Sequence, residues 1–190
     1  MTAPTRLIQN AGSNDTIGFR EALLDVPPAE RGKVLLRTLD ENKHNVGHFF
    51  SGFGNYDCYS LARRELDGDQ RRVFVNQPDW NADTPVTCLG VLTPPFIKEP
   101  WPKYDVDAER IRTDQEGFRR LEDGKISLVQ PMLEDGADLF DVNNQGHTAV
   151  EEAGLSGLDR LEAKLAELWE KLFSAAKKPE LQTVVLNKLG

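Results

Sequence analysis

Cysteine and long apolar runs are both scarce in this 190-residue sequence. Only Cys58 and Cys88 are present, which excludes a disulfide-dense scaffold and favours a reducing, cytoplasmic environment. No run of about 18 apolar residues occurs, so we expect no membrane span and no membrane partner. Residues 1–14 lack a basic flank followed by an apolar core, and we therefore expect no secretory signal.

Positive charge is also in short supply. Lys and Arg number 23 against 31 Asp and Glu, which gives a net charge of −8. Nucleic-acid binding through a broad basic face is therefore disfavoured, because phosphate contacts require clustered Lys and Arg. The local pairs Arg63-Arg64 and Arg71-Arg72 favour a salt-bridged rim over a phosphate site.

The spacing of apolar residues predicts helices over most of the chain. We expect helices over 16–26, 28–39 and 45–65, after a polar and frayed start over 1–14. The first of these helices carries four candidate core residues, Ile17, Phe19, Leu23 and Leu24. In the last third, five leucines share one helix face that Trp169 widens: Leu158, Leu161, Leu165, Leu168 and Leu172.

Three segments of the sequence share one turn pattern. The third reads Asn143-Asn144-Gln145-Gly146-His147-Thr148, with Gly157 following at a distance that fits a second helix. The second reads Asp79-Trp80-Asn81-Ala82-Asp83-Thr84-Pro85, and the first runs from Asp40 to His48 with Lys43 in the glycine position and Asn45 in the threonine position. An Asp or Asn followed by a left-handed residue makes a tight turn, and the Thr or Asn after it caps a helix.

These segments resemble the ankyrin repeat, most closely in the third segment. The resemblance implies an all-α solenoid with a helical N-terminal cap over 1–39, repeats over 40–157 and a helical C-terminal cap over 158–190. The turn anchors Asp40, Asp79 and Asn143 are 39 and 64 positions apart, whereas a plain ankyrin period is about 33 residues. We therefore expect a small insertion near 67–72 and a large, Pro-rich one over about 93–120.

In the second repeat, one position fits the ankyrin pattern and another departs from it. The second helix of this repeat is expected to open at Gly124, where the chain would reverse direction as at Gly54 and Gly157. Pro131 then falls inside that helix, where it removes a hydrogen bond and should bend the helix.

Catalytic and metal-binding patterns are weak. His44 and His48 have the spacing of metal ligands on a helix, but no Glu follows the first His as the zinc motif requires, so structural roles in and after a turn are favoured. Cys58 and Cys88 are expected to be buried as small apolar residues. We expect no cofactor and no enzymatic activity; the alternative is an enzyme whose 93–120 insertion completes a site beside His48 or His147.

The resemblance implies that the turns and the helices after them form a protein-binding surface. The candidate contact residues are His44, Phe53, Trp80, Asn81, Asp83, Trp101, Gln145 and His147. Trp80 and Trp101 stand out because exposed tryptophans are enriched at binding hot spots; alternatively, both rings pack together on the insertion. The acidic chain favours a protein partner with a basic patch. Two more specific settings compete: a bacterial immunity protein or inhibitor that occludes a toxin or enzyme, and a secreted effector or adaptor that engages a host or signalling protein.

Overall fold

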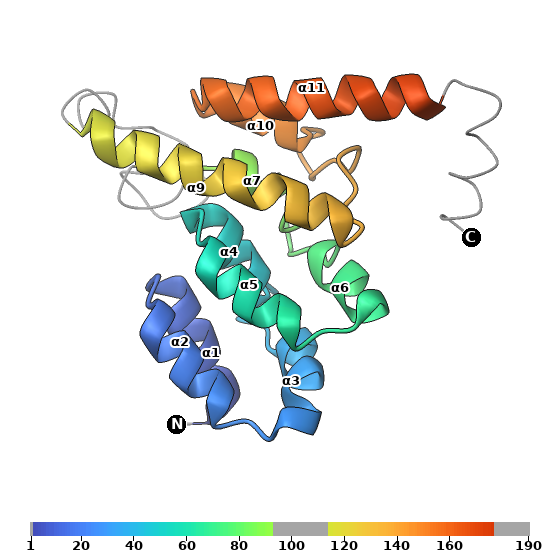
Figure 1. Cartoon of the computed structure of the whole chain (residues 1–190). Helices are drawn as coiled ribbons and strands as arrows, with labels where there is room; N and C mark the ends of the chain where they lie inside the picture. Colours follow the sequence, from blue (N-terminus) through green and yellow to red (C-terminus); the bar gives the residue numbers. More distant parts are fainter. Residues whose placement is uncertain (1, 93–113, 177–190) are drawn as a thin grey trace.

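The computed structural model describes residues 2–92 and 114–176, which fold into a stack of short helices (Figure 1). The helices are α1 (Ala3–Gly12), α2 (Thr16–Leu24), the 3₁₀ helix η1 (Pro28–Glu30), α3 (Arg31–Arg37), α4 (Val46–Phe53), α5 (Tyr56–Arg64), α6 (Gly68–Val75), α7 (Thr87–Gly90), α9 (Gln115–Glu134), α10 (Ala149–Leu155) and α11 (Asp159–Ala176). Over these residues, the only β-type pairing is an isolated bridge between Leu39 and Asn45. The all-α prediction is confirmed.

The helices form two rows that run the length of the molecule (Figure 1). In the first row α1 contacts α4, α4 contacts α7 and α7 contacts α10, while in the second row α2 contacts α5, α5 contacts α9 and α9 contacts α11. Each helix therefore packs mainly on its neighbours in the stack. This quasi-linear arrangement is the kind that repeated helical units produce, because one unit alone cannot bury its apolar face.

The helices begin where the sequence supplies a side-chain cap. Asp15, Asn55 and Asp114 each accept a hydrogen bond from a backbone N–H in the first turn of α2, α5 and α9. Such caps satisfy donors that a helix start leaves unpaired. The small insertion expected near 67–72 is α6, whose N-terminus is closed by a reciprocal pair of hydrogen bonds between Asp67 and Gln70.

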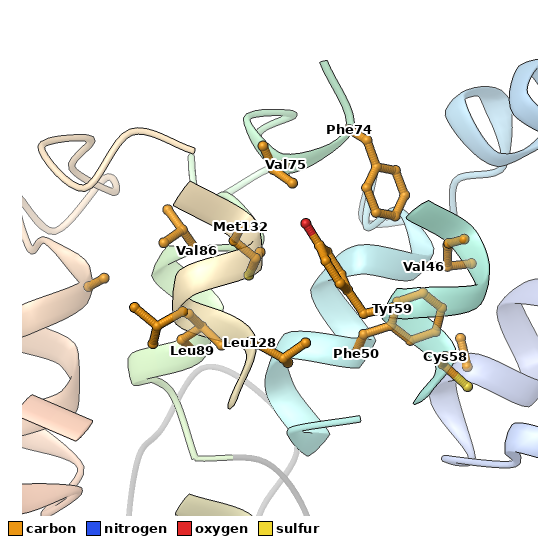
Figure 2. Close-up of a cluster of buried hydrophobic side chains, with 14 of the residues drawn as sticks. Val46, Phe50, Cys58, Tyr59, Phe74, Val75, Val86, Leu89, Leu128 and Met132 are labelled. Carbon is orange, nitrogen blue, oxygen red and sulfur yellow. The ribbon is translucent and has the colours of Figure 1, made fainter. Parts of the chain in front are cut away.

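The core lies between the two rows and is continuous along the stack (Figure 2). Phe50 of α4 and Tyr59 of α5 are fully buried, and Leu89 of α7 and Met132 of α9 continue the same cluster. The Tyr59 hydroxyl donates a hydrogen bond to Asp135 at 2.7 Å. The core thus extends through every unit of the described stack and holds the turns that precede α4, α7 and α10 in line.

Two expectations for the N-terminal segment were wrong. Residues 3–12 are helical, because Thr2 caps the helix, Pro4 lies in its first turn, and Leu7 and Ala11 face the core one turn apart. Within α2, Phe19 and Leu23 are buried as expected. Ile17, however, is 73% exposed and Leu24 is also exposed, because they lie on the opposite face of that helix.

The second repeat also differs from its expected form. Residues 115–134 form one uninterrupted helix, α9, that passes through both Gly124 and Pro131, so the chain does not reverse at Gly124. A Cβ atom at position 124 would lie 2.4 Å from the carbonyl oxygen of Gly54. Gly124 is therefore a point of close helix approach, and the insertion expected over 93–120 ends before Gln115. Residues 93–113 lie outside the described residues.

The C-terminal helix α11 packs along only part of its length. Leu158, Leu161 and Leu165 are buried as predicted, but Leu172 is exposed. Trp169 was expected in the core; it is half-buried and rests edge-on against Phe140, with ring centroids 4.4 Å apart. Among the described helices, none has the length and apolar character needed to cross a bilayer.

Candidate functional site

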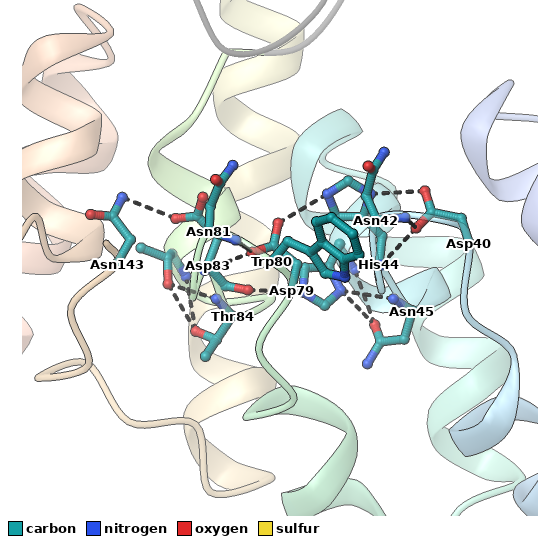
Figure 3. A network of polar contacts seen from close by, with 12 residues as sticks. Asp40, Asn42, His44, Asn45, Asp79, Trp80, Asn81, Asp83, Thr84 and Asn143 are labelled. Carbon is teal, nitrogen blue, oxygen red and sulfur yellow. Dashed lines mark hydrogen bonds and ion pairs between the residues drawn. The ribbon is translucent and has the colours of Figure 1, made fainter. Parts of the chain in front are cut away.

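Three turns with one backbone geometry lie side by side along the stack (Figure 3). We call residues 40–44, 79–83 and 143–147 finger turns 1, 2 and 3. In each, the N–H of the first residue donates to the carbonyl of the fifth, and the Oδ1 atom of the first accepts from the N–H groups of the third and fifth. The fourth residue has a positive φ of 64° at Lys43, 59° at Ala82 and 80° at Gly146. The predicted equivalence of these three positions is confirmed.

A capped helix start follows each finger turn. Asn45 caps α4 and Thr148 caps α10, each through a reciprocal pair of hydrogen bonds with the residue three positions later. Before the short helix α7, the N–H groups of Thr84 and Thr87 each donate to the other residue's hydroxyl. Local hydrogen bonds thus fix the start of the helix that follows each finger turn.

Backbone hydrogen bonds join neighbouring finger turns. The N–H of Trp80 donates to the carbonyl of Asn42 at 3.2 Å, and the N–H of Asn144 donates to the carbonyl of Asn81 at 2.7 Å. The side-chain amide of Asn144 also donates to the carbonyl of Trp80 at 3.0 Å. Three segments far apart in sequence therefore present their tips in one fixed row.

Buried polar groups support this row from below. His44 lies between two carboxylates, with Nδ1 2.9 Å from Asp40 Oδ2 and Nε2 3.0 Å from Asp79 Oδ2 (Figure 3). Burial opposes protonation of His44, but its contacts with Asp79 and Asp40 outweigh burial and raise its pKa. Burial opposes ionisation of Asp79, but the hydrogen bond from His44, the charge of His48 and two backbone N–H groups of finger turn 2 together outweigh burial and lower its pKa. His44 therefore ties finger turn 1 to finger turn 2.

His48 makes the second link between these turns. Its Nδ1 accepts from the N–H of Asn45 at 3.0 Å, and its Nε2 lies 3.0 Å from the carbonyl oxygen of Asp83. Burial, helped by the nearby positive charge of His44, lowers the pKa of His48 to about 4. A neutral imidazole that accepts at Nδ1 and donates from Nε2 satisfies both contacts.

Finger turn 3 is joined to finger turn 2 through a shared amide. The Nδ2 atom of Asn143 donates to Asp83 Oδ1 at 3.1 Å and to Glu152 Oε1 at 2.8 Å. His147 Nδ1 lies 3.0 Å from the same Glu152 oxygen. Burial, together with the negative charges of Asp79 and Glu152, raises the pKa of Asp83 to about 6. This part of the network holds excess negative charge.

The structure divides the expected contact residues into exposed and buried groups. Trp80 is 65% exposed, and Asn81 and Gln145 are also exposed at the tips of their turns. His44 and Asp83 are buried, and their polar groups form hydrogen bonds within the network below the row. These two were expected to contact a partner, but the structure buries both, and each faces the neighbouring turn instead of solvent.

The remaining three candidates lie elsewhere or face partly inward. His147 is half-buried against Glu152. Phe53 is half-buried at the C-terminal end of α4, about 12 Å along that helix from finger turn 1 at about 1.5 Å per residue. Phe53 was expected to be exposed at the end of this helix; it is half-buried there and does not join the tip row. Trp101 lies outside the described residues.

Sequence reasoning missed four exposed side chains of the row. Glu41, Asn42, Lys43 and Asn144 lie beside the predicted ones, and the Nζ atom of Lys43 is 5.9 Å from the centroid of the Trp80 ring. Their positions in the sequence could have identified them. They occupy the second to fourth places of the turn pattern, where the hydrogen bonds within the turn leave the side chains facing outward. The exposed tips carry side-chain amides, one aromatic ring, the Lys43 ammonium and the Glu41 carboxylate, groups that can bind a partner surface.

Chemistry of other kinds finds little support in the described residues. Over 2–92 and 114–176, no group of three His, Cys, Asp or Glu side chains is placed to hold a metal ion. Cys58 and Cys88 are buried as predicted, and burial raises the pKa of each thiol. Neither is thereby activated as a thiolate nucleophile.

Comparisons with known proteins bear on the fold. No protein-family model matches the sequence, and no curated protein sequence matches it. Among solved structures, the fold is similar to a chain in the crystal structure of the yeast ribosomal protein Rps3 in complex with its chaperone Yar1, with a TM-score of 0.57. The two chains are 17% identical, and the match covers 85% of this chain and 88% of that one.

Proposed function

We propose that this chain is an ankyrin-repeat protein that binds a protein partner through the row formed by finger turns 1–3. One observation carries the proposal: Trp80 is 65% exposed at the centre of a row whose backbone is fixed on both sides. An exposed indole ring forgoes the favourable free energy that its burial would provide. Such rings recur as anchors at the centre of protein interfaces.

The rigidity of the row supports binding over a structural role. The carbonyl and N–H of Trp80 are both hydrogen-bonded to neighbouring turns. The two aspartates of the same turn are held from either side, Asp79 by His44 and Asp83 by Asn143. A surface already fixed in the free protein loses little conformational entropy when a partner docks. The amides at the tips add hydrogen-bonding groups around the aromatic centre, as the polar rim of an interface does.

The identity of the fold is part of the proposal. Three finger turns, each followed by a helix, and two rows of stacked helices are the features that an ankyrin solenoid would show. The similar solved chain comes from a structure that is itself a protein–protein complex, which is consistent with a binding role. The net charge of −8 favours a partner surface that is basic.

The test compares two single substitutions at equally exposed positions. Trp80 is 65% exposed and Leu155, on α10, is 66% exposed. Affinity capture from the source cells, with quantitative mass spectrometry, should recover a protein with the wild-type chain and with Leu155→Ala but not with Trp80→Ala. Equal capture by all three would place the interface elsewhere, and melting curves of the free variants would show whether Trp80→Ala had damaged the fold.

A further inference from the structure

The face of the Trp80 indole already carries a positive charge in the free protein. Lys43 extends from finger turn 1 so that its ammonium lies 5.9 Å from the ring centroid. This distance is near the outer limit, about 6 Å, at which a cation is attracted to an aromatic face. Both side chains are exposed, so the contact is weak and readily replaced.

The charges around this ring favour a cation. Asp40, Asp79 and Asp83 lie at the bases of finger turns 1 and 2, and Glu152 and the exposed Glu41 add two further carboxylates to the row. The basic groups of the same row are His44, held between two of these carboxylates, His147 beside Glu152, and Lys43 itself. The carboxylates outnumber the basic groups. They therefore add to the attraction that the face of the indole itself exerts on a cation.

We propose that the face of Trp80 receives an arginine side chain of the protein partner, and that Lys43 occupies this face until the partner displaces it. The inference rests on the proposed function, because it names the group that the finger-turn row recognises. A guanidinium is planar and weakly hydrated, so it stacks on an indole better than an ammonium does. Its remaining N–H groups can donate to acceptors of the kind that the exposed tips carry, the side-chain amide oxygen of Asn81 and the carboxylate of Glu41.

The backbone at Lys43 provides a clean variant. Its φ of 64° is a conformation that glycine adopts without strain, so Lys43→Gly removes the ammonium and keeps the turn. The probe is a five-residue Gly-Ser peptide with one central arginine. The control peptide carries citrulline, which has the same shape without the charge.

Binding is followed by NMR titration of the indole N–H signals. In the wild-type protein the arginine peptide should shift the Trp80 signal, and the citrulline peptide should shift it at least fivefold less at equal concentration. Lys43→Gly should bind the arginine peptide several-fold more tightly, because no internal cation competes. The half-buried Trp169, which lies edge-on against Phe140, is the internal control and should not shift.

The outcomes separate this inference from the proposed function. Equal shifts with arginine and citrulline, or no tighter binding by Lys43→Gly, would overturn the assignment of arginine. If capture of the partner still depended on Trp80, the protein-binding function would stand alone. If partner capture were independent of Trp80, both proposals would fall.

Discussion

Lys125 offers a sharp test of how charge is buried in this fold. The side chain leaves α9 fully buried, and its Nζ atom donates to the carbonyl oxygens of Ser51 at 3.1 Å, Cys88 at 3.3 Å and Val91 at 2.8 Å. These carbonyls lie at the C-terminal ends of α4 and α7, where helices leave acceptors unpaired. Burial lowers the pKa of Lys125 from 10.5 to about 7.

The substitution Lys125→Met sets two effects against each other. Removing the ammonium would strand Val91 O, which has no other donor among the described residues, and weaken the pairing of the other two carbonyls, at a total cost of about 2–5 kcal/mol. It would also remove the cost of taking the proton off Lys125 on folding, about 4 kcal/mol near pH 7.5 from the shift in pKa at 1.36 kcal/mol per unit. These magnitudes nearly offset, so stability at a single pH decides nothing.

The pH dependence of stability tests whether Lys125 is buried with a lowered pKa. Between pH 7 and 10.5 the unfolded chain holds a proton on Lys125 that the folded chain has released, so the contribution of Lys125 to the free energy of unfolding rises with pH. The contribution of Lys125 should amount to about 2.5 kcal/mol between pH 7.5 and 9.5 at 1.36 kcal/mol per unit. Urea denaturation of both proteins at the two pH values measures it as a double difference, in which other titrating groups cancel. Parallel pH profiles for wild type and Lys125→Met would refute the reasoning.

Three further predictions concern the turns and the network. Ala82→Gly should raise the free energy of unfolding by about 1 kcal/mol in urea titrations, because the φ of 59° strains any residue with a Cβ; a loss of stability would contradict the turn geometry. Gly54→Ala should cost over about 3 kcal/mol, since its Cβ would meet backbone atoms at 2.7–2.9 Å, whereas Gly146→Ala meets no atom within 4 Å and should cost only about 1 kcal/mol of strain. Comparing their melting temperatures tests this order. Asp83→Asn should add about 1–3 kcal/mol at pH 7.5 and flatten stability between pH 4 and 6, because a folded pKa of about 6 means that ionising Asp83 destabilises the fold as pH rises; an unchanged pH profile would count against it.

The turn register could be predicted because local chemistry repeats. An Asp or Asn anchor and a capping residue stand at the same offsets in all three finger turns, so Lys43 and Ala82 could be matched to Gly146 although neither is glycine. The tip positions followed from the same register. The exposure of Trp80 was therefore foreseeable from the sequence of finger turn 2.

The sequence predictions failed where contacts between residues far apart in the chain determine the local structure. Gly124 was interpreted as a chain reversal, but its reason is Gly54, 70 positions earlier, whose carbonyl leaves no room for a Cβ. His44 and Asp83 were expected to contact a partner because a turn pattern does not say which polar side chains point toward the next turn. The helix over 3–12 was missed because its polar composition hid the two residues, Leu7 and Ala11, that α4 and α2 help to bury.

The hydrogen bonds between finger turns have a consequence for hydrogen exchange. The N–H groups of Trp80 and Asn144 are protected only by carbonyls 38 and 63 positions away, on the preceding turn. Each amide can exchange with solvent when either of two adjacent units opens, whereas an amide inside a helix reports mainly on its own unit. These two amides should therefore exchange at the rate of the less stable neighbour, and they would reveal which junction of the stack opens first.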